Sequence, residues 1–218
     1  MSARPCSSDS ADRRVALGVL LVLAGPSGVG KGTIVRRLLA RDPRLWFSVS
    51  ATSRPRREDE VDGKDYLFID RDEFERLRDA GGLLEWFDVY GDLKGTPRAP
   101  VEEHLTGGDD VLLEVDVQGA LAVKDAYPDA VLVFVRAPSR EEQRRRLVAR
   151  GQDDPAAIER RLAQADAEEA LADRFDAVVV NDDPDGAADE VAAILNAYRE
   201  ARTPPEPGSP PPAGPPDR

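Results

Sequence analysis

Four runs of mainly apolar residues recur along the chain, with helical segments between and after them. The runs are Val19–Ala24, Val111–Asp116, Val131–Val135 and Ala177–Val180. Strands buried on both faces have continuous apolar sequences, whereas strands with one solvated face alternate. The pattern therefore predicts an α/β fold in which a parallel sheet is covered by helices on both faces.

The segments between the runs have the apolar spacing of helices. Helices are expected at 34–40, 119–126, 140–150, 155–171 and 185–199. Ser139 precedes the third of them, and Glu142 stands three residues later, which is the arrangement of a capping box. These helices are expected to cover the sheet.

A different order of elements interrupts this alternation between residues 45 and 105. Strands are expected at 45–50, 65–69, 83–90 and 94–96, with helices at 71–80 and 101–105 and a loop at 51–62. Asp70 is the expected cap of the first of these helices, and Pro100 begins the second. The unit from about Tyr66 to Thr96 is therefore predicted to be a small mixed βαββ insert.

Both ends of the chain differ in composition from the rest. Residues 1–14 are small and polar, and residues 203–218 are dominated by proline. Such segments bury too little apolar surface to fold alone. We therefore expect disorder in both tails and one compact domain over residues 15–202.

Charge and cysteine content exclude several classes of protein. A net charge of −12, with 42 acidic and 30 basic residues, argues against nucleic acid or an anionic membrane as a partner. The one cysteine, Cys6, allows no intrachain disulfide and no cysteine-based metal site. The apolar run at 15–24 is too short to span a bilayer, so we expect a cytoplasmic protein.

A glycine-rich sequence follows the first apolar run directly. It is Gly25-Pro26-Ser27-Gly28-Val29-Gly30-Lys31-Gly32-Thr33. A strand that turns through glycines into a helix directs backbone N–H groups and a helix N-terminus at one point, which suits a phosphate. Lys31 is expected to reach the β- and γ-phosphates of a nucleoside triphosphate. Because Gly32 replaces the usual hydroxyl residue, the hydroxyl for Mg²⁺ is displaced to Thr33 or acts indirectly.

Two carboxylates, Glu114 and Asp116, end the strand that is expected beside this loop. P-loop enzymes hold Mg²⁺ with an acidic group in this place, directly or through water. The alternative is that one of the two is an ordinary cap or ion-pair partner. We favour Asp116 as the functional residue and leave Glu114 open.

Further motifs follow the loop in a fixed order. They are Ser50-Ala51-Thr52-Ser53-Arg54-Pro55-Arg56-Arg57, Val61-Asp62-Gly63-Lys64-Asp65-Tyr66, Leu84-Glu85-Trp86, Gly95-Thr96-Pro97 and Val115-Asp116-Val117-Gln118-Gly119. With the glycine-rich loop ahead of them, they closely resemble guanylate kinase, the family that transfers a phosphoryl group from ATP to GMP in purine metabolism. The resemblance runs from about Val19 to the final helix.

The resemblance implies roles for individual residues. The implied GMP site comprises Ser50, Arg54, Arg57, Tyr66, Glu85, Lys94, Thr96 and Asp116, within an insert at about 50–97. The implied ATP site comprises residues 25–33 and Asn181, and the implied catalytic residues are Lys31, Arg54, Arg146, Arg150 and Arg161, the last three in a lid at about 139–172. Thr33 and Asp116 would serve Mg²⁺, which accompanies ATP. Lys94 departs from the tyrosine that the family commonly has there.

The chemistry of guanine agrees with this implication. Guanine presents N1–H and N2–H₂ as adjacent donors, which a carboxylate at Glu85 and hydroxyls at Thr96 or Ser50 complement. Adenine has an acceptor at N1, and it would leave buried groups unpaired.

Three alternatives remain beside this interpretation. A phosphosugar kinase on the same scaffold would keep the loop but would not need Glu85 and Thr96. A non-catalytic protein-binding module of the same fold would lack a working Lys31 loop, and an unrelated P-loop regulator would lack the two-sided set of arginines and guanine readers. The expected substrates are ATP and GMP, with dGMP left open, and the expected state is a monomer or a small homo-oligomer.

Overall fold

The computed structural model describes residues 17–89, 91–151 and 154–202, and both expected tails, with Cys6, lie outside the described residues. Its core is a five-stranded parallel sheet in the order β2-β7-β1-β8-β9. The strands are β1 (Leu20–Ala24), β2 (Leu45–Phe47), β7 (Asp110–Glu114), β8 (Val131–Arg136) and β9 (Ala177–Val180). The four expected apolar runs are therefore four strands of one sheet, and β2, which ends at Phe47 instead of Ser50, adds a fifth at its edge.

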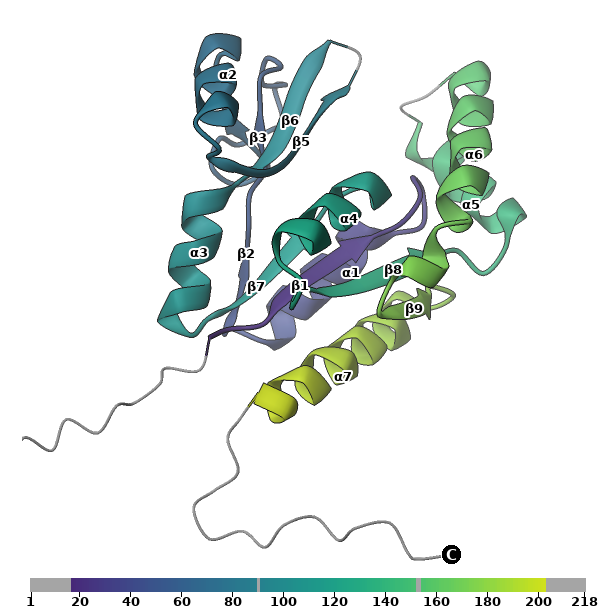
Figure 1. The fold of residues 1–218 in the computed structure, drawn as a ribbon. Coiled ribbons are helices and arrows are strands. Elements are labelled where there is room, and N and C mark those ends of the chain that lie inside the picture. The colour runs from purple at the N-terminus through teal and green to yellow at the C-terminus, as the bar shows by residue number, and fades with distance from the viewer. Residues whose placement is uncertain (1–16, 90, 152–153, 203–218) are drawn as a thin grey trace, which may run out of the picture.

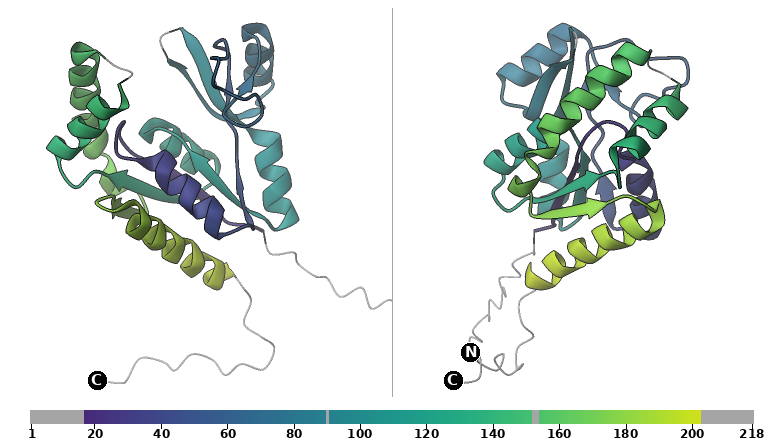
Figure 2. Two further views of the ribbon diagram at one scale, coloured as in Figure 1. Left: turned by 180° about the vertical axis from the view of Figure 1, so that it is seen from behind. Right: turned by 90° about the vertical axis from the view of Figure 1, so that its right-hand side faces the viewer.

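The central strand β1 has only apolar residues, because all five of its side chains are buried. The core helices are α1 (Lys31–Arg41), α3 (Arg98–Gly107), α4 (Val117–Ala126) and α7 (Pro184–Arg202). Leu21 and Leu23 belong to the cluster under α1 and α7, whereas Leu20 and Val22 belong to the cluster under α3 and α4. Figures 1 and 2 show helices on both sides of the sheet, so the predicted architecture is confirmed.

The insert forms a second, four-stranded mixed sheet in the order β4-β3-β6-β5. Its elements are β3 (Ala51–Thr52), β4 (Leu67–Phe68), α2 (Arg71–Asp79), β5 (Leu83–Val89) and β6 (Asp92–Pro97). A cluster of its own, built on Ala51, Phe74, Leu83 and Leu93, holds it together. The sheet begins before the expected Tyr66, because Ala51 pairs with both Leu67 and Gly95.

A pair of helices, α5 (Arg140–Arg150) and α6 (Pro155–Glu169), makes up most of the expected lid. Leu147, Ile158 and Leu162 form a separate small cluster between them. The expected helix to Leu171 ends at Glu169, and a 3₁₀ turn (Ala172–Arg174) follows. In Figures 1 and 2 the insert and the lid rise on opposite sides of the carboxyl edge of the main sheet, with the glycine-rich loop between them.

Several helices begin earlier than the sequence pattern predicted. Helix α1 starts at Lys31 instead of Ile34, directly after Gly30 in the left-handed conformation. Helix α4 starts at Val117 instead of Gly119, because Asp116 is its cap. Helix α3 starts at Arg98, so that Pro100 lies in the first turn, where a missing N–H costs no intrahelical hydrogen bond.

Replacing Phe74 by alanine should destabilise the insert. The side chain is fully buried at the centre of the insert's cluster, and removal of a buried phenylalanine costs about 3–5 kcal/mol of unfolding free energy. Urea denaturation measures the loss. The control Val148→Ala, at a position 57% exposed, should change stability by about 0.5 kcal/mol or less, and equal losses in the two variants would contradict the description of this cluster.

Candidate active site

The glycine-rich loop leaves β1 at the carboxyl edge of the sheet and enters α1 (Figure 1). Gly25 has φ 145°, and a Cβ there would lie 2.1 Å from the carbonyl oxygen of Val135, so this position excludes a side chain. Gly30, with φ 97°, precedes α1, and no side chain caps the helix. The start of α1 therefore presents backbone N–H groups and the positive end of its dipole, as an anion site requires.

The ammonium group of Lys31 folds back over this loop. Its Nζ donates to the carbonyl oxygens of Gly25 at 2.6 Å and Pro26 at 3.2 Å. Burial lowers the pKa of Lys31, and the charges of Glu114 and Glu168 partly oppose that effect. A cation held only by carbonyl oxygens is well placed for a phosphate, which binds it more strongly.

The two carboxylates at the end of β7, Glu114 in its last position and Asp116 two residues later, have different surroundings. Glu114 Oε2 lies 3.5 Å from the position that a Cβ on Gly32 would take, so the carboxylate lies beside the first turn of α1. Asp116 caps α4, and its Oδ1 accepts a hydrogen bond from the N–H of Gly119 at 2.7 Å. Glu114 therefore lies beside the phosphate-loop helix, and Asp116 is also the cap of α4, so the preference for Asp116 stays a prediction.

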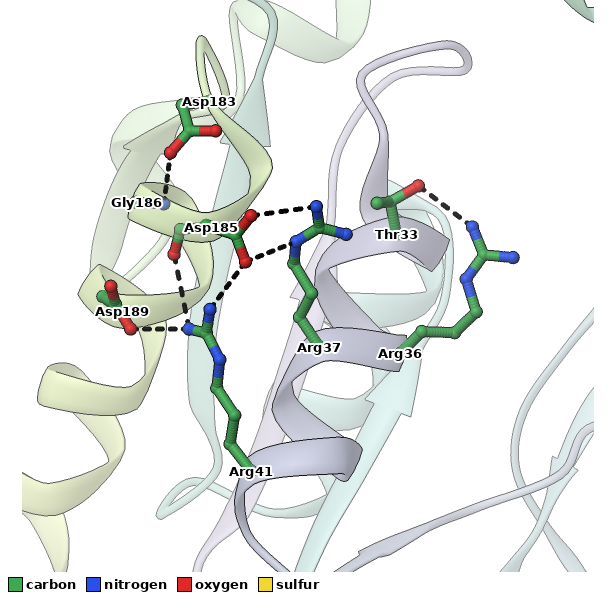
Figure 3. Close-up of polar contacts among 8 residues, drawn as sticks. All are labelled: Thr33, Arg36, Arg37, Arg41, Asp183, Asp185, Gly186 and Asp189. Carbon is green, nitrogen blue, oxygen red and sulfur yellow. Dashed lines mark hydrogen bonds and ion pairs between the residues drawn. The ribbon is translucent and has the colours of Figure 1, made fainter.

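The hydroxyl of Thr33 is engaged elsewhere. Its Oγ1 accepts a hydrogen bond from Arg36 Nη2 at 3.2 Å (Figure 3). A neighbouring guanidinium repels a metal ion. The assignment of Thr33 and Asp116 to Mg²⁺ stays a prediction.

Ion pairs on the other side of α1 attach it to α7, as Figure 3 shows. Arg37 and Arg41 both bind the carboxylate of Asp185, and Arg41 also binds Asp189, at distances of 2.5–3.0 Å. Helix α7 begins three residues after Asn181, the predicted adenine-side residue. These ion pairs therefore hold α1 against the start of α7, which follows Asn181 closely in the chain.

Glu85 owes its position to a bulge in β5. The pairs Leu83↔Pro97 and Trp86↔Gly95 flank the bulge. Two residues of β5, Leu84 and Glu85, therefore oppose the single residue Thr96, and both point into buried surroundings. Glu85 is 7% exposed, and its Oε1 accepts a hydrogen bond from Thr96 Oγ1 at 2.5 Å. Ser50 precedes β3, and the pairing Ala51↔Gly95 continued by one residue places it opposite Thr96.

A glycine allows Glu85 and Asp116 to approach the same place. A Cβ on Gly119 would lie 3.2 Å from Asp116 Oδ1 and 3.3 Å from Glu85 Oε2. Burial, aided by the charge of Asp116 and opposed by the hydrogen bond from Thr96, raises the pKa of Glu85 to about 7. A ligand that donates N–H groups here would stabilise the ionised carboxylate.

The predicted phosphate-binding residues of the insert gather around one aromatic ring. The guanidinium carbon of Arg54 lies 5.1 Å from the ring centre of Tyr66, and Lys94 Nζ lies 5.2 Å from the same centre. Arg54 also forms a two-bond ion pair with Glu60, which the sequence did not single out. The side chain of Arg57 is exposed, and none of these ring contacts involves it.

The predicted lid arginines differ in how close they come to the loop. Arg146 donates to the carbonyl oxygens of Val29 at 3.0 Å and of Asn181 at 2.9 Å. Arg161 donates to Ser27 Oγ at 3.1 Å, whereas Arg150 is exposed at the end of α5. The lid therefore contacts the loop through two of the three arginines.

Asn181 itself is almost fully buried beside the loop. Its Nδ2 donates to the carbonyl oxygen of Val29 at 2.8 Å, while its Oδ1 is buried without a hydrogen-bond partner among the described residues. A buried acceptor without a partner is costly unless a ligand supplies a donor.

Sequence reasoning missed three residues of this site. Gln143 of α5 is 6% exposed and donates to the carbonyl oxygen of Ser27 at 2.8 Å. Glu168 of α6 lies close enough to Lys31 to affect its pKa, and Glu60 holds Arg54. All three lie in strongly polar segments, where a functional side chain has the same sequence signal as a solvated one.

A phosphate loop at the carboxyl edge of a parallel sheet, faced by an insert and a lid rich in arginine, defines the class of P-loop phosphotransferases. A family model described as "Guanylate kinase" matches residues 18–198. Curated guanylate kinases of Symbiobacterium thermophilum and Gloeobacter violaceus are 52% and 55% identical over 186 and 179 residues, which cover 85% and 82% of this chain and 88% and 87% of theirs. A solved guanylate kinase structure from Anaplasma phagocytophilum matches with a TM-score of 0.69 at 37% identity, over 84% of this chain and 86% of that one.

This chain therefore belongs to the guanylate kinase family, as the motifs indicated, and it is a kinase.

Glu85 should make stability depend on pH. Because its pKa is about 7 in the fold against an ordinary 4.5, the folded state binds the proton more tightly, and the favourable contribution present below pH 4.5 is lost as pH rises to about 7. The loss amounts to about 3 kcal/mol at most.

The measurement is the unfolding free energy of the wild type and of Glu85→Gln at several pH values. The difference between the two should change in favour of the glutamine variant between pH 4.5 and 7. A difference that stays constant over this range would show that Glu85 titrates normally.

Proposed function

We propose that the chain transfers the γ-phosphoryl group of ATP to GMP, giving ADP and GDP, and so recycles GMP in purine nucleotide metabolism. The buried pair of Glu85 and Thr96 carries this proposal, because it combines an acceptor that needs donors with a buried hydroxyl in the insert. Guanine N1–H and N2–H₂ are two adjacent donors that match the carboxylate. The resemblance to guanylate kinases assigns Ser50 and Asp116 to the same site.

The phosphate of GMP is assigned to Arg54, Arg57, Tyr66 and Lys94. The contacts of Arg54 and Lys94 with the Tyr66 ring support this assignment, since they concentrate positive charge in one part of an acidic chain. Lys94 supplies a charge where the family commonly has a tyrosine hydroxyl. The base and the phosphate of one nucleotide would then lie along a single face of the insert.

The triphosphate of ATP is assigned to the glycine-rich loop, residues 25–33, and to Lys31. The free Oδ1 of Asn181 supports a place for adenine nearby, because the 6-amino group of adenine is a donor. Arg146, Arg150 and Arg161 would neutralise charge that spreads over the transferred phosphoryl group.

Mg²⁺ fits the donors that the structure provides. Mg²⁺ is held by one or two carboxylates together with substrate phosphates and water, and Glu114 beside Gly32 is such a carboxylate at the loop. We assign the ion to Glu114 and, through water, to Asp116, in place of Thr33. When bound with ATP, the ion would neutralise charge on the β- and γ-phosphate oxygens.

In this mechanism the chain contributes positioning and charge. The insert holds the acceptor phosphate, the loop and Lys31 hold the donor, and transfer proceeds in line without a covalent enzyme intermediate. A phosphosugar kinase remains the enzymatic alternative, but it gives no role to the buried Glu85 and Thr96.

Within the described residues, no helix is both long and apolar enough to cross a bilayer. We place the chain in the cytoplasm, because an acidic protein with a single cysteine suits a reducing compartment. The proposal includes assembly as a monomer or a small homo-oligomer. The use of dGMP is a matter for measurement.

A coupled assay of ADP release with ATP and several nucleoside monophosphates tests the function directly. Lys31→Met should lower kcat with GMP by about a hundred- to a thousandfold, because it removes a charge at the transferred phosphoryl group and little volume. Circular dichroism and thermal melting should remain as in the wild type. Turnover near the wild-type rate would exclude Lys31 from catalysis.

Glu85→Gln should change specificity. The amide presents an N–H₂ group toward the donors of guanine, and loss of a hydrogen bond to a charged group costs about 1.5–3 kcal/mol, or about ten- to a hundredfold in kcat/KM for GMP. AMP, which has an acceptor at N1, should lose nothing. The ratio of kcat/KM for GMP to that for AMP is the quantity to measure, and an unchanged ratio would reopen the phosphosugar-kinase alternative.

A further inference from the structure

The ion pair between Arg54 and Glu60 uses one particular edge of the guanidinium group. Glu60 Oε2 accepts from Arg54 Nη1 at 2.7 Å, and Oε1 accepts from Nη2. The second N–H of Nη1 donates to the carbonyl oxygen of Pro55 at 2.9 Å. A guanidinium has five N–H groups in a fixed plane, so these contacts use three of them.

The remaining two N–H groups lie together on another edge. They are Nε–H and the second N–H of Nη2, and no hydrogen bond occupies them among the described residues. Two parallel donors on one edge form the fork that binds two oxygens of a phosphate. The contacts of Glu60 and Pro55 thus leave one phosphate-binding edge of Arg54 open.

Glu60 is anchored independently of the Arg54 side chain. Its Oε2 also accepts from the backbone N–H of Arg57 at 2.9 Å, its own N–H donates to the Arg57 carbonyl oxygen at 3.3 Å, and its carbonyl oxygen accepts from Arg56 Nη1 at 2.5 Å. The Glu60 side chain is 13% exposed and that of Arg54 is 18% exposed. A phosphate that displaced Glu60 would therefore have to break several contacts of a largely buried carboxylate.

The guanidinium group of Arg54 also lies close to the rings of Tyr66 and Phe68. The guanidinium carbon lies 5.1 Å and 5.5 Å from their centres. With the pair to Glu60, these contacts fix both the position and the rotation of Arg54. The hydrogen bonds from Arg54 and from the Arg57 N–H lower the pKa of Glu60 to about 2, so the carboxylate stays charged throughout the physiological range.

We propose that Glu60 is a positioning residue for the acceptor substrate: it holds the Nη1–Nη2 edge of Arg54 and so presents the Nε–Nη2 edge to the phosphate of GMP. This inference rests on the proposed function, since it takes GMP as the occupant of the insert. It assigns Glu60 a role in binding that neither the family comparisons nor the sequence motifs give it.

The test compares steady-state kinetics of Glu60→Gln with two matched variants. Glu75→Gln removes an exposed, single-bond pair with Arg71, at 3.0 Å in the same insert, and serves as the neutral control for loss of one carboxylate charge. Arg54→Lys removes the fork itself. The inhibition constant of guanosine, which has the base but no phosphate, is measured in each variant together with the melting temperature.

Glu60→Gln should raise KM for GMP about tenfold or more, while kcat, KM for ATP and the guanosine inhibition constant stay within about twofold. Glu75→Gln should change none of them. A lower KM for GMP would show instead that Glu60 competes with the phosphate, and an unchanged KM would show that Arg54 needs no positioning. A parallel loss of guanosine binding, ATP binding and melting temperature would show a merely structural role, and each of these outcomes overturns the proposal.

Failure of the proposed function has a different signature. It would appear as absent turnover of GMP by the wild type, or as an unchanged KM for GMP in Arg54→Lys. In either case the site assignment fails before the role of Glu60 is tested.

Discussion

The rest of the site depends on the close approach of two backbones at Gly25. A Cβ at this position would lie 2.1 Å from the carbonyl oxygen of Val135, so the chain can leave β1 along this path only as glycine. The path carries the loop over the end of β8 and into α1, and it brings Lys31 back onto the carbonyl oxygen of Gly25. The carboxylates at the end of β7 and the arginines of the lid are then neighbours of a loop whose course is already fixed.

The sequence was sufficient for the main sheet and the loop, because both depend on local patterns. Continuous apolar runs predict strands buried on two faces, and the glycine spacing predicts the loop. The start of the insert could not be found in this way, since β3 has two residues and exists only through pairing with Leu67 and Gly95.

The details of the site were harder to predict from the sequence, because they too depend on contacts that form only in the fold. The resemblance paired Glu85 with Thr96, but the bulge that makes them face each other is a property of two strands together. The different surroundings of Glu114 and Asp116 appear only in the fold, and a carboxylate such as Glu60 in a charged loop has no signal of its own. A contact that a polar residue makes in the fold, with a partner near or far along the chain, is not visible in the local sequence pattern.

The bulge in β5 also has a mechanical consequence. Leu83 belongs to the cluster of the insert, whereas the next residue, Leu84, belongs to the cluster of the main sheet. Within β5, the boundary between the two clusters therefore falls between two adjacent residues. Any shift of the insert against the main sheet would act on this segment, which Glu85 follows directly, whereas Arg54 and Lys94 lie farther along the insert's sheet. The residue proposed to bind the base thus stands where the insert meets the main sheet, and the residues proposed to bind the phosphate stand away from that junction.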